Sequence, residues 1–139
     1  MNVFMQAALA AAREAVESAD EIPVGAVIVK DGEIIARAHN LKEAMHDPTA
    51  HAEILAIREA ARHLHDWRLS GCDLYVTLEP CPMCMAAIRE ARIRRLYCGA
   101  SKPSDAPSLK EPETYFGIEE DACTEILKSF FRVRREADA

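Results

Sequence analysis

The sequence has no apolar run long enough to cross a bilayer, and no basic flank precedes its first apolar residues, as it would in a signal peptide. It also lacks low-complexity tracts, since 139 residues include only 5 glycines and 7 prolines and 29% are charged. These absences argue against a membrane-spanning or disordered chain and predict a cytoplasmic globular protein. At 50% hydrophobic content, we expect residues 1–139 to form a single domain.

An excess of positive charge is absent as well. The formal net charge of -6 argues against binding nucleic acid by blanket neutralisation of phosphates. Local basic clusters remain, and each is as compatible with a solvated face as with an RNA contact. One cluster contains Arg89, Arg92, Arg94 and Arg95, and the other contains Arg132, Arg134 and Arg135.

Apolar periodicity and turn residues predict alternating helices and strands. We expect strands at 24–30, 33–38, 74–78 and 95–99, and helices at 4–19, 50–64, 83–91 and from about Cys123 onwards. Asp31-Gly32 is typical of a hairpin turn, and the strand, helix and strand between 74 and 99 should form a parallel unit. Residues 101–112 contain three prolines and are predicted to be a loop. The pattern indicates an α/β protein.

Two of the five cysteines form a Cys-Pro-Met-Cys pair, Cys81 and Cys84. In a cytosolic chain such a pair indicates metal or redox chemistry more than a disulfide framework. The other three, Cys72, Cys98 and Cys123, fall in apolar patterns and are expected to be small buried hydrophobic residues.

Zinc prefers thiolate and imidazole ligands, and a catalytic site uses three protein ligands so that the fourth position is open to water. His51, Cys81 and Cys84 make such a set. The cysteines are three residues apart at a predicted helix start, so both sulfurs share one face, and the helix N-terminus favours their thiolate forms. We therefore predict one Zn²⁺ held by these three residues.

Glu53 follows His51 by two positions, which turns its side chain to another side of the helix. It is therefore not needed as a ligand. A carboxylate in the first turn of a helix that faces a cleft can take a proton from water and pass it to a ring nitrogen and a leaving amine. Because zinc lowers the pKa of water to roughly 7, the nucleophile exists at neutral pH.

Other interpretations of the cysteine pair remain open. A redox pair and a structural zinc ribbon both use this spacing, although a ribbon would need a second pair, which the sequence lacks. A closed site would recruit Cys72 or Cys98 as a fourth ligand. A zinc-stabilised binding module without turnover is a further possibility. The remaining histidines, His39, His46, His63 and His65, are expected not to bind metal.

The motifs His51-Ala52-Glu53 and Pro80-Cys81-Pro82-Met83-Cys84 resemble the signature of the zinc-dependent cytidine and deoxycytidylate-type deaminases. Within that superfamily, residues 22–27, 47–54 and 74–81 look like the bacterial tRNA-specific adenosine deaminases, which make inosine at the wobble position. The likeness runs to about residue 100. It resumes at 123–135, which is similar to the aromatic, basic C-terminal helix that those enzymes lay against the anticodon loop.

The resemblance implies a three-layer α/β/α sandwich with a mixed central sheet, a homodimer, and one zinc ion per subunit. It also implies a pocket in which Asn40 hydrogen-bonds the target nucleoside, with Val24 and Ala26 as further contacts. A base could stack on Phe130 or Phe131, whereas core packing is the alternative for at least one of them.

The segment 101–118 departs from the tRNA enzymes, because it is shorter and carries Lys102 where they usually have an acidic residue. Two substrates therefore remain in competition. The first is adenosine in a tRNA anticodon loop. The second is a free base or nucleoside of the guanine, cytosine or adenine type.

Overall fold

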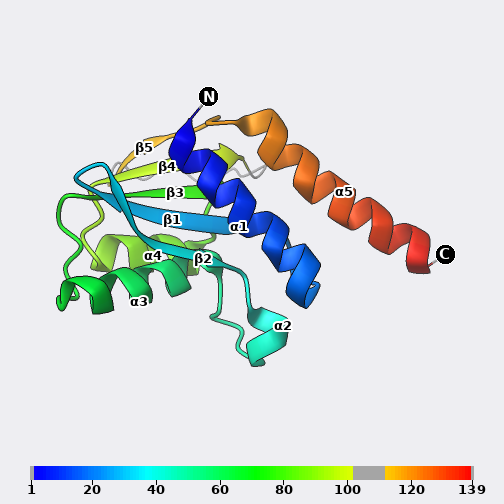
Figure 1. Ribbon diagram of the computed structural model, residues 1–139, viewed down its shortest axis with the longest axis horizontal. Helices are drawn as coiled ribbons and strands as arrows, with labels where there is room; N and C mark the ends of the chain where they lie inside the picture. The colour runs from blue at the N-terminus through cyan, green and yellow to red at the C-terminus, as the bar shows by residue number, and fades with distance from the viewer. Residues whose placement is uncertain (1, 102–111, 139) are drawn as a thin grey trace.

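The computed structural model describes residues 2–101 and 112–138, where strands and helices alternate as an α/β protein requires (Figure 1). Helices and strands follow one another as α1 (Val3–Ala19), β1 (Gly25–Lys30), β2 (Glu33–His39), α2 (Lys42–Met45), α3 (Ala52–Leu64), β3 (Cys72–Leu78), α4 (Pro82–Glu90), β4 (Arg95–Ala100), β5 (Glu113–Tyr115) and α5 (Glu120–Asp138).

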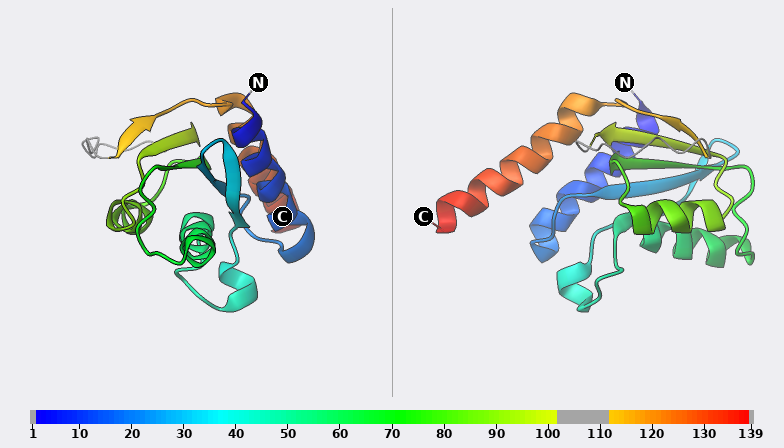
Figure 2. Two further views of the ribbon diagram at one scale, coloured as in Figure 1. Left: turned by 60° about the vertical axis from the view of Figure 1, so that its left-hand side comes forward. Right: turned by 180° about the vertical axis from the view of Figure 1, so that it is seen from behind.

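The five strands form one mixed sheet in the order β2-β1-β3-β4-β5. β1 runs antiparallel to both β2 and β3, whereas β3, β4 and β5 are parallel. Helices α3 and α4 cover one face of the sheet, and α1 and α5 cover the other (Figures 1 and 2). The predicted three-layer sandwich with a mixed central sheet, including the parallel pairing of β3 with β4, is therefore confirmed.

Each of the two sheet faces has its own apolar core, because alternate strand residues point to opposite faces. Ile28, Leu74 and Val76 pack towards α3 and α4. Val27 and Tyr75 pack towards α1 and α5. The central strands are buried on both sides, which is why they read as nearly continuous apolar runs in the sequence.

Two glycines allow the helices to approach the sheet closely. A Cβ added at Gly25 would lie 1.9 Å from the carbonyl oxygen of Ala8 in α1. A Cβ added at Gly99 would lie 2.3 Å from the Sγ atom of Cys123 in α5. Both distances are far below van der Waals contact, so only glycine fits at these points.

The short elements α2 and β5 were not predicted. Four and three residues carry too little periodicity to be recognised. Helix α5 also begins three residues before Cys123, because Glu120 and Asp121 extend it with acidic groups in its first turn. Of the predicted loop, residues 102–111 lie outside the described residues, and so does Lys102.

Cys72, Cys98 and Cys123 are all fully buried, as expected for small apolar side chains. Among the described residues, none of the helices combines the length and the apolar character needed to cross a bilayer.

Candidate metal centre

Two helix starts build the site. His51 occupies the N-cap position of α3 and Cys81 that of α4, both in extended backbone conformation. Ser, Thr, Asp or Asn usually occupies this position because the side chain accepts a hydrogen bond from the first turn. Neither His51 nor Cys81 caps its own helix in this way. Both side chains turn instead towards each other.

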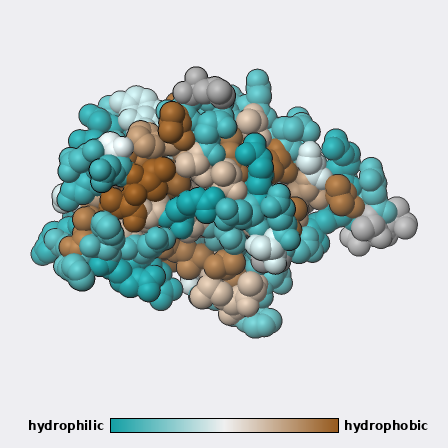
Figure 3. All heavy atoms as spheres, viewed as in Figure 1, coloured by the Kyte–Doolittle hydropathy of each residue, from teal (hydrophilic) through white to brown (hydrophobic). Residues whose placement is uncertain are grey.

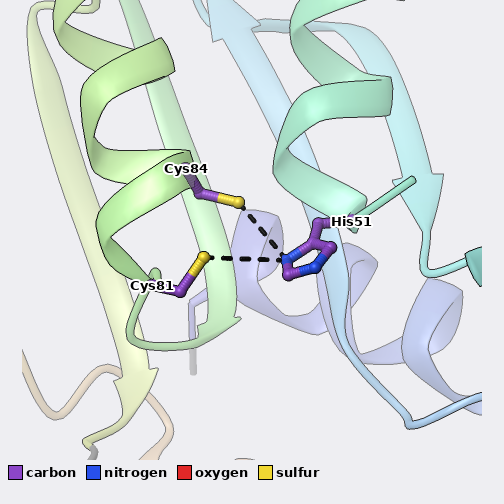
Figure 4. Close-up of side chains that lie close together, drawn as sticks. All are labelled: His51, Cys81 and Cys84. Carbon is purple, nitrogen blue, oxygen red and sulfur yellow. Dashed lines mark hydrogen bonds between the residues drawn. The ribbon is translucent and has the colours of Figure 1, made fainter. Parts of the chain in front are cut away.

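The three predicted ligand residues come together (Figure 4). The Nδ1 atom of His51 lies 3.5 Å from the Sγ atom of Cys84 and 3.8 Å from that of Cys81, and all three ligand atoms lie within 4.8 Å of one another. Around a tetrahedral zinc ion with bonds of about 2.3 Å to sulfur and about 2.0 Å to nitrogen, neighbouring ligand atoms are about 3.5–3.8 Å apart. The donor atoms are therefore spaced to fit zinc.

Electrostatics also favours a cation between these side chains. Burial raises the pKa of the Cys84 thiol, and the negative charge of Glu53 and then of Cys81 raises it further. In the protein alone, burial therefore favours the neutral thiol of Cys84. A divalent cation reverses this balance because it stabilises the thiolate directly.

Glu53 is almost completely buried, with 4% of its surface exposed, in the first turn of α3. Its negative charge is one of the causes that raise the pKa of the Cys84 thiol. It does not belong to the group of three ligand atoms. A buried carboxylate thus follows the ligand residue His51 by two positions without belonging to the ligand set.

Within the part of the chain that the structure describes, the only group of histidine, cysteine and acidic side chains arranged for a metal is His51, Cys81 and Cys84. Cys72 and Cys98 do not join it. A structural zinc site would be closed by four protein ligands, whereas three ligands leave the fourth position to water or substrate. Among the described residues, the number of ligands is that of a catalytic site.

The residues predicted to contact substrate lie at different depths. Asn40 is 7% exposed, and its side chain is hydrogen-bonded to the backbone of Ala52 and Ile22. Val24 is 6% exposed. Ala26 has no exposed surface and packs in the core between the sheet and α3 and α4.

The two adjacent phenylalanines of α5 differ in exposure. Phe130 is buried and packs edge-on against Phe131, with the guanidinium of Arg134 4.5 Å from its ring centre. Phe131 is 42% exposed. Phe130 is therefore the more buried of the two rings, although it still lines the hollow that contains Asn40, and Phe131 is the more exposed one.

Hollows lie on both sides of α5 at Phe131. One, of about 580 Å³, runs from Leu78 and Ala100 to the helix and is lined on the helix by Lys128, Arg132 and Arg135. The other, of about 510 Å³, contains Asn40. Polar and apolar side chains are mixed along the projecting end of α5 (Figure 3). The sequence indicated the basic cluster, but only the fold shows that it faces the end of β3, just before Cys81.

Fold and site together define a zinc-dependent deaminase. Residues 1–100 match the family model described as the cytidine and deoxycytidylate deaminase zinc-binding region, and the chain belongs to this family. The predictions of a zinc cofactor and of a deaminase are thereby confirmed.

Two individual relatives indicate which kind of deaminase the chain resembles. The chain is 49% identical to the tRNA-specific adenosine deaminase of Agrobacterium fabrum, over 97% of this chain and 96% of the relative. It is 43% identical to the enzyme of that name from Bacillus subtilis, over 97% and 91%. The predicted resemblance to tRNA-specific adenosine deaminases is confirmed.

Solved structures of deaminases superpose on this chain. A structure from a study of A-to-I editing by tRNA:A34 deaminases at the wobble position superposes with a TM-score of 0.83 at 49% identity, covering 89% of this chain and 98% of the other. Guanine deaminase from Bacillus subtilis superposes with a TM-score of 0.71 at 36% identity, covering 97% and 95%.

Proposed function

We propose that the chain deaminates adenosine to inosine at the wobble position of tRNA. The observation that carries this proposal is the 49% identity with a tRNA-specific adenosine deaminase over 97% of the chain, which therefore includes α5 as well as the metal centre. The overall reaction replaces the C6 amine of adenine by oxygen from water and releases ammonia.

His51, Cys81 and Cys84 are the proposed metal ligands. When held there, zinc supplies a Lewis acid that makes water nucleophilic at neutral pH. Glu53 accepts one proton of the attacking water and donates it to the adjacent ring nitrogen. It then takes the second proton, from the hydroxyl added at C6, and gives it to the amine as the C–N bond breaks and the C6 carbonyl forms. Its burial beside Cys84 suits this role because no bulk water competes for the proton.

The target base is proposed to enter between the metal centre and Asn40. Two hydrogen bonds to backbone atoms leave the Asn40 amide with one N–H for the nucleoside. Val24, which is 6% exposed, is the proposed apolar contact, with Ala26, which has no exposed surface, in the core behind it. Phe131 offers the stacking surface for a neighbouring unstacked base, whereas Phe130 holds it in place from the core.

The basic hollow beside α5 is proposed to hold the RNA backbone. Its helix side carries Lys128, Arg132 and Arg135, and none of the described residues that line it is acidic. A local positive groove can bind phosphates although the whole chain has a net charge of -6. The acidic net charge is therefore compatible with an RNA substrate.

We further propose that the enzyme is a single-domain, cytoplasmic homodimer. The support is the resemblance to the tRNA enzymes, together with Met83, which is 38% exposed on α4 beside the metal centre. Contact with a second copy would cover this apolar side chain. Sedimentation of the purified protein tests the assembly.

The test of the activity uses zinc-loaded protein and an unmodified tRNA transcript with adenosine at the wobble position. Sequencing, in which inosine reads as guanosine, should show conversion at that position and at no other adenosine. The same transcript with guanosine at the wobble position serves as the control. Absence of conversion under conditions where the protein retains zinc refutes the proposal.

A free base is the second candidate substrate, favoured by the 36% identity with guanine deaminase over 97% of the chain. Ammonia release from guanine, adenine, adenosine and cytidine separates the two. Release from one of these at a rate above that with tRNA would assign the chain to small-molecule chemistry.

A further inference from the structure

At the start of α3, the N-cap side chain accepts no hydrogen bond from the helix backbone. The first N–H groups of any helix lack partners within the helix, and the N-cap side chain normally accepts a hydrogen bond from one of them. In α3 the N-cap residue is His51, which makes no cap hydrogen bond, and its Nδ1 atom faces the sulfurs of Cys81 and Cys84. A residue used as a metal ligand cannot also cap the helix with that atom.

Asn40 supplies an acceptor from outside the helix. Its Oδ1 atom accepts a hydrogen bond of 2.8 Å from the backbone N–H of Ala52, and its Nδ2 atom donates one of 3.2 Å to the carbonyl oxygen of Ile22. The two partners fix the orientation of the amide, because an N–H needs an acceptor and a carbonyl needs a donor. Asn40 is 7% exposed, and its bond to Ala52 is buried, whereas the bond to Ile22 is partly buried.

The backbone of Asn40 is itself held at the end of β2. Its N–H donates to the carbonyl oxygen of Val24, and the next N–H, of Leu41, donates to Ala50 just before the helix. The backbone at Asn40 and Leu41 is thus hydrogen-bonded to Val24, just before β1, and to Ala50, just before α3.

The peptide group that Asn40 binds joins His51 to Ala52. A bond to its N–H fixes the direction in which the chain leaves His51, and Glu53 follows one residue later. We propose that Asn40 is a positioning residue that sets the place of the His51 imidazole and the Glu53 carboxylate through the Ala52 N–H. This role is distinct from any contact with a nucleoside and exists in the protein without substrate.

Glu21 provides a comparison because its side chain also accepts a hydrogen bond from a backbone N–H at the start of a helix, α2, which carries no metal ligand. It is 2% exposed, and its Oε1 atom accepts a hydrogen bond of 2.8 Å from the N–H of Ala44 in α2. The N-cap residue of α2, Leu41, makes no side-chain cap bond. Removing Glu21 therefore removes a cap of the same kind away from the metal centre.

The experiment compares Asn40→Leu, Asn40→Asp and Glu21→Ala, with no RNA or nucleoside present. Leu keeps the branching of Asn and offers no acceptor, whereas Asp keeps the acceptor for the Ala52 N–H and loses only the donor to the carbonyl oxygen of Ile22. Two quantities are measured on zinc-loaded protein: the hydrogen exchange rate of the Ala52 amide by NMR, and zinc retention against a competing chelator. If Asn40→Leu fails to fold, Asn40→Ala replaces it.

We expect Asn40→Leu to speed Ala52 exchange by about fivefold or more and to weaken zinc retention by about tenfold or more, as loss of a group that orients a metal ligand does. Asn40→Asp should stay much closer to the wild type in both quantities. Glu21→Ala should leave both within about twofold.

Three results would overturn the inference. The first is that Asn40→Leu keeps the wild-type exchange rate at the Ala52 amide and the wild-type zinc retention. Asn40 would then act only as a substrate contact. The second is equal loss in Asn40→Asp and Asn40→Leu. The third is equal loss of zinc in Glu21→Ala, which would reflect general destabilisation. None of these results depends on which substrate the enzyme uses.

Discussion

Replacing Glu53 by glutamine tests the catalytic assignment most directly. The side chain is 4% exposed, and glutamine has nearly the same volume, so Glu53→Gln opens no cavity. The change removes a group that can accept and release a proton. Positioned proton transfer contributes about 10²–10⁴-fold to a rate, so we expect kcat to fall by that factor, or about 3–5 kcal/mol in the activation free energy.

The protein should otherwise stay intact. Glu53 is not among the three clustered ligand atoms, so the zinc content of Glu53→Gln should equal that of the wild type. Its thermal stability should be equal or higher, because a neutral amide is less costly to bury than a carboxylate. The assay is single-turnover inosine formation on the wobble-adenosine transcript, with zinc measured on the same samples.

Glu59→Gln is the matched control. Glu59 lies on the same helix, is exposed, and accepts a hydrogen bond from the backbone N–H of Arg37. It should retain activity within about twofold, as surface substitutions usually do. A wild-type kcat in Glu53→Gln, or loss of its zinc, would show that Glu53 is not the proton shuttle.

Three further changes probe metal, packing and RNA contact. Cys84→Ala should lose zinc and lower the thermal unfolding temperature, because metal binding is coupled to folding; metal analysis and a thermal melt check this, and full zinc occupancy would exclude Cys84 as a ligand. Gly99→Ala should destabilise the protein by about 2 kcal/mol or more, since the new Cβ would lie 2.3 Å from the Cys123 Sγ atom; a chemical denaturation curve like the wild type's would contradict the close packing of α5. Phe131→Ala should raise KM for tRNA by roughly 5- to 100-fold without changing stability, whereas an unchanged KM would remove Phe131 from the RNA surface.

The cysteine pair of the ligand set was predictable from the sequence because its spacing is local. Cys81 and Cys84 lie within one helical turn, and Pro82 marks where that turn begins. The alternation of the central strands likewise predicted a buried sheet. Long elements with a clear period need no knowledge of tertiary contacts to be recognised.

The residues around the metal centre were harder to assign, because their roles depend on contacts between distant elements. Phe130 and Phe131 are adjacent in a helix, so the pattern alone could not decide which ring faces the core. The bond from Asn40 to Ala52 depends on the end of β2 meeting the start of α3, which no local signal encodes. The family resemblance indicated Asn40, and only the fold shows which group its amide oxygen binds.

The two helices that begin at the metal centre compensate in different ways for the missing side-chain hydrogen bond at the N-cap. Both N-cap residues, His51 and Cys81, are ligands, so neither caps its helix. In α4 the next residue is Pro82, which has no N–H and therefore leaves no donor to satisfy at that position. In α3 the next residue is Ala52, whose N–H needs a partner, and Asn40 provides it. A ligand at the N-cap thus demands either a proline after it or an acceptor from elsewhere in the chain, and this metal centre uses one of each.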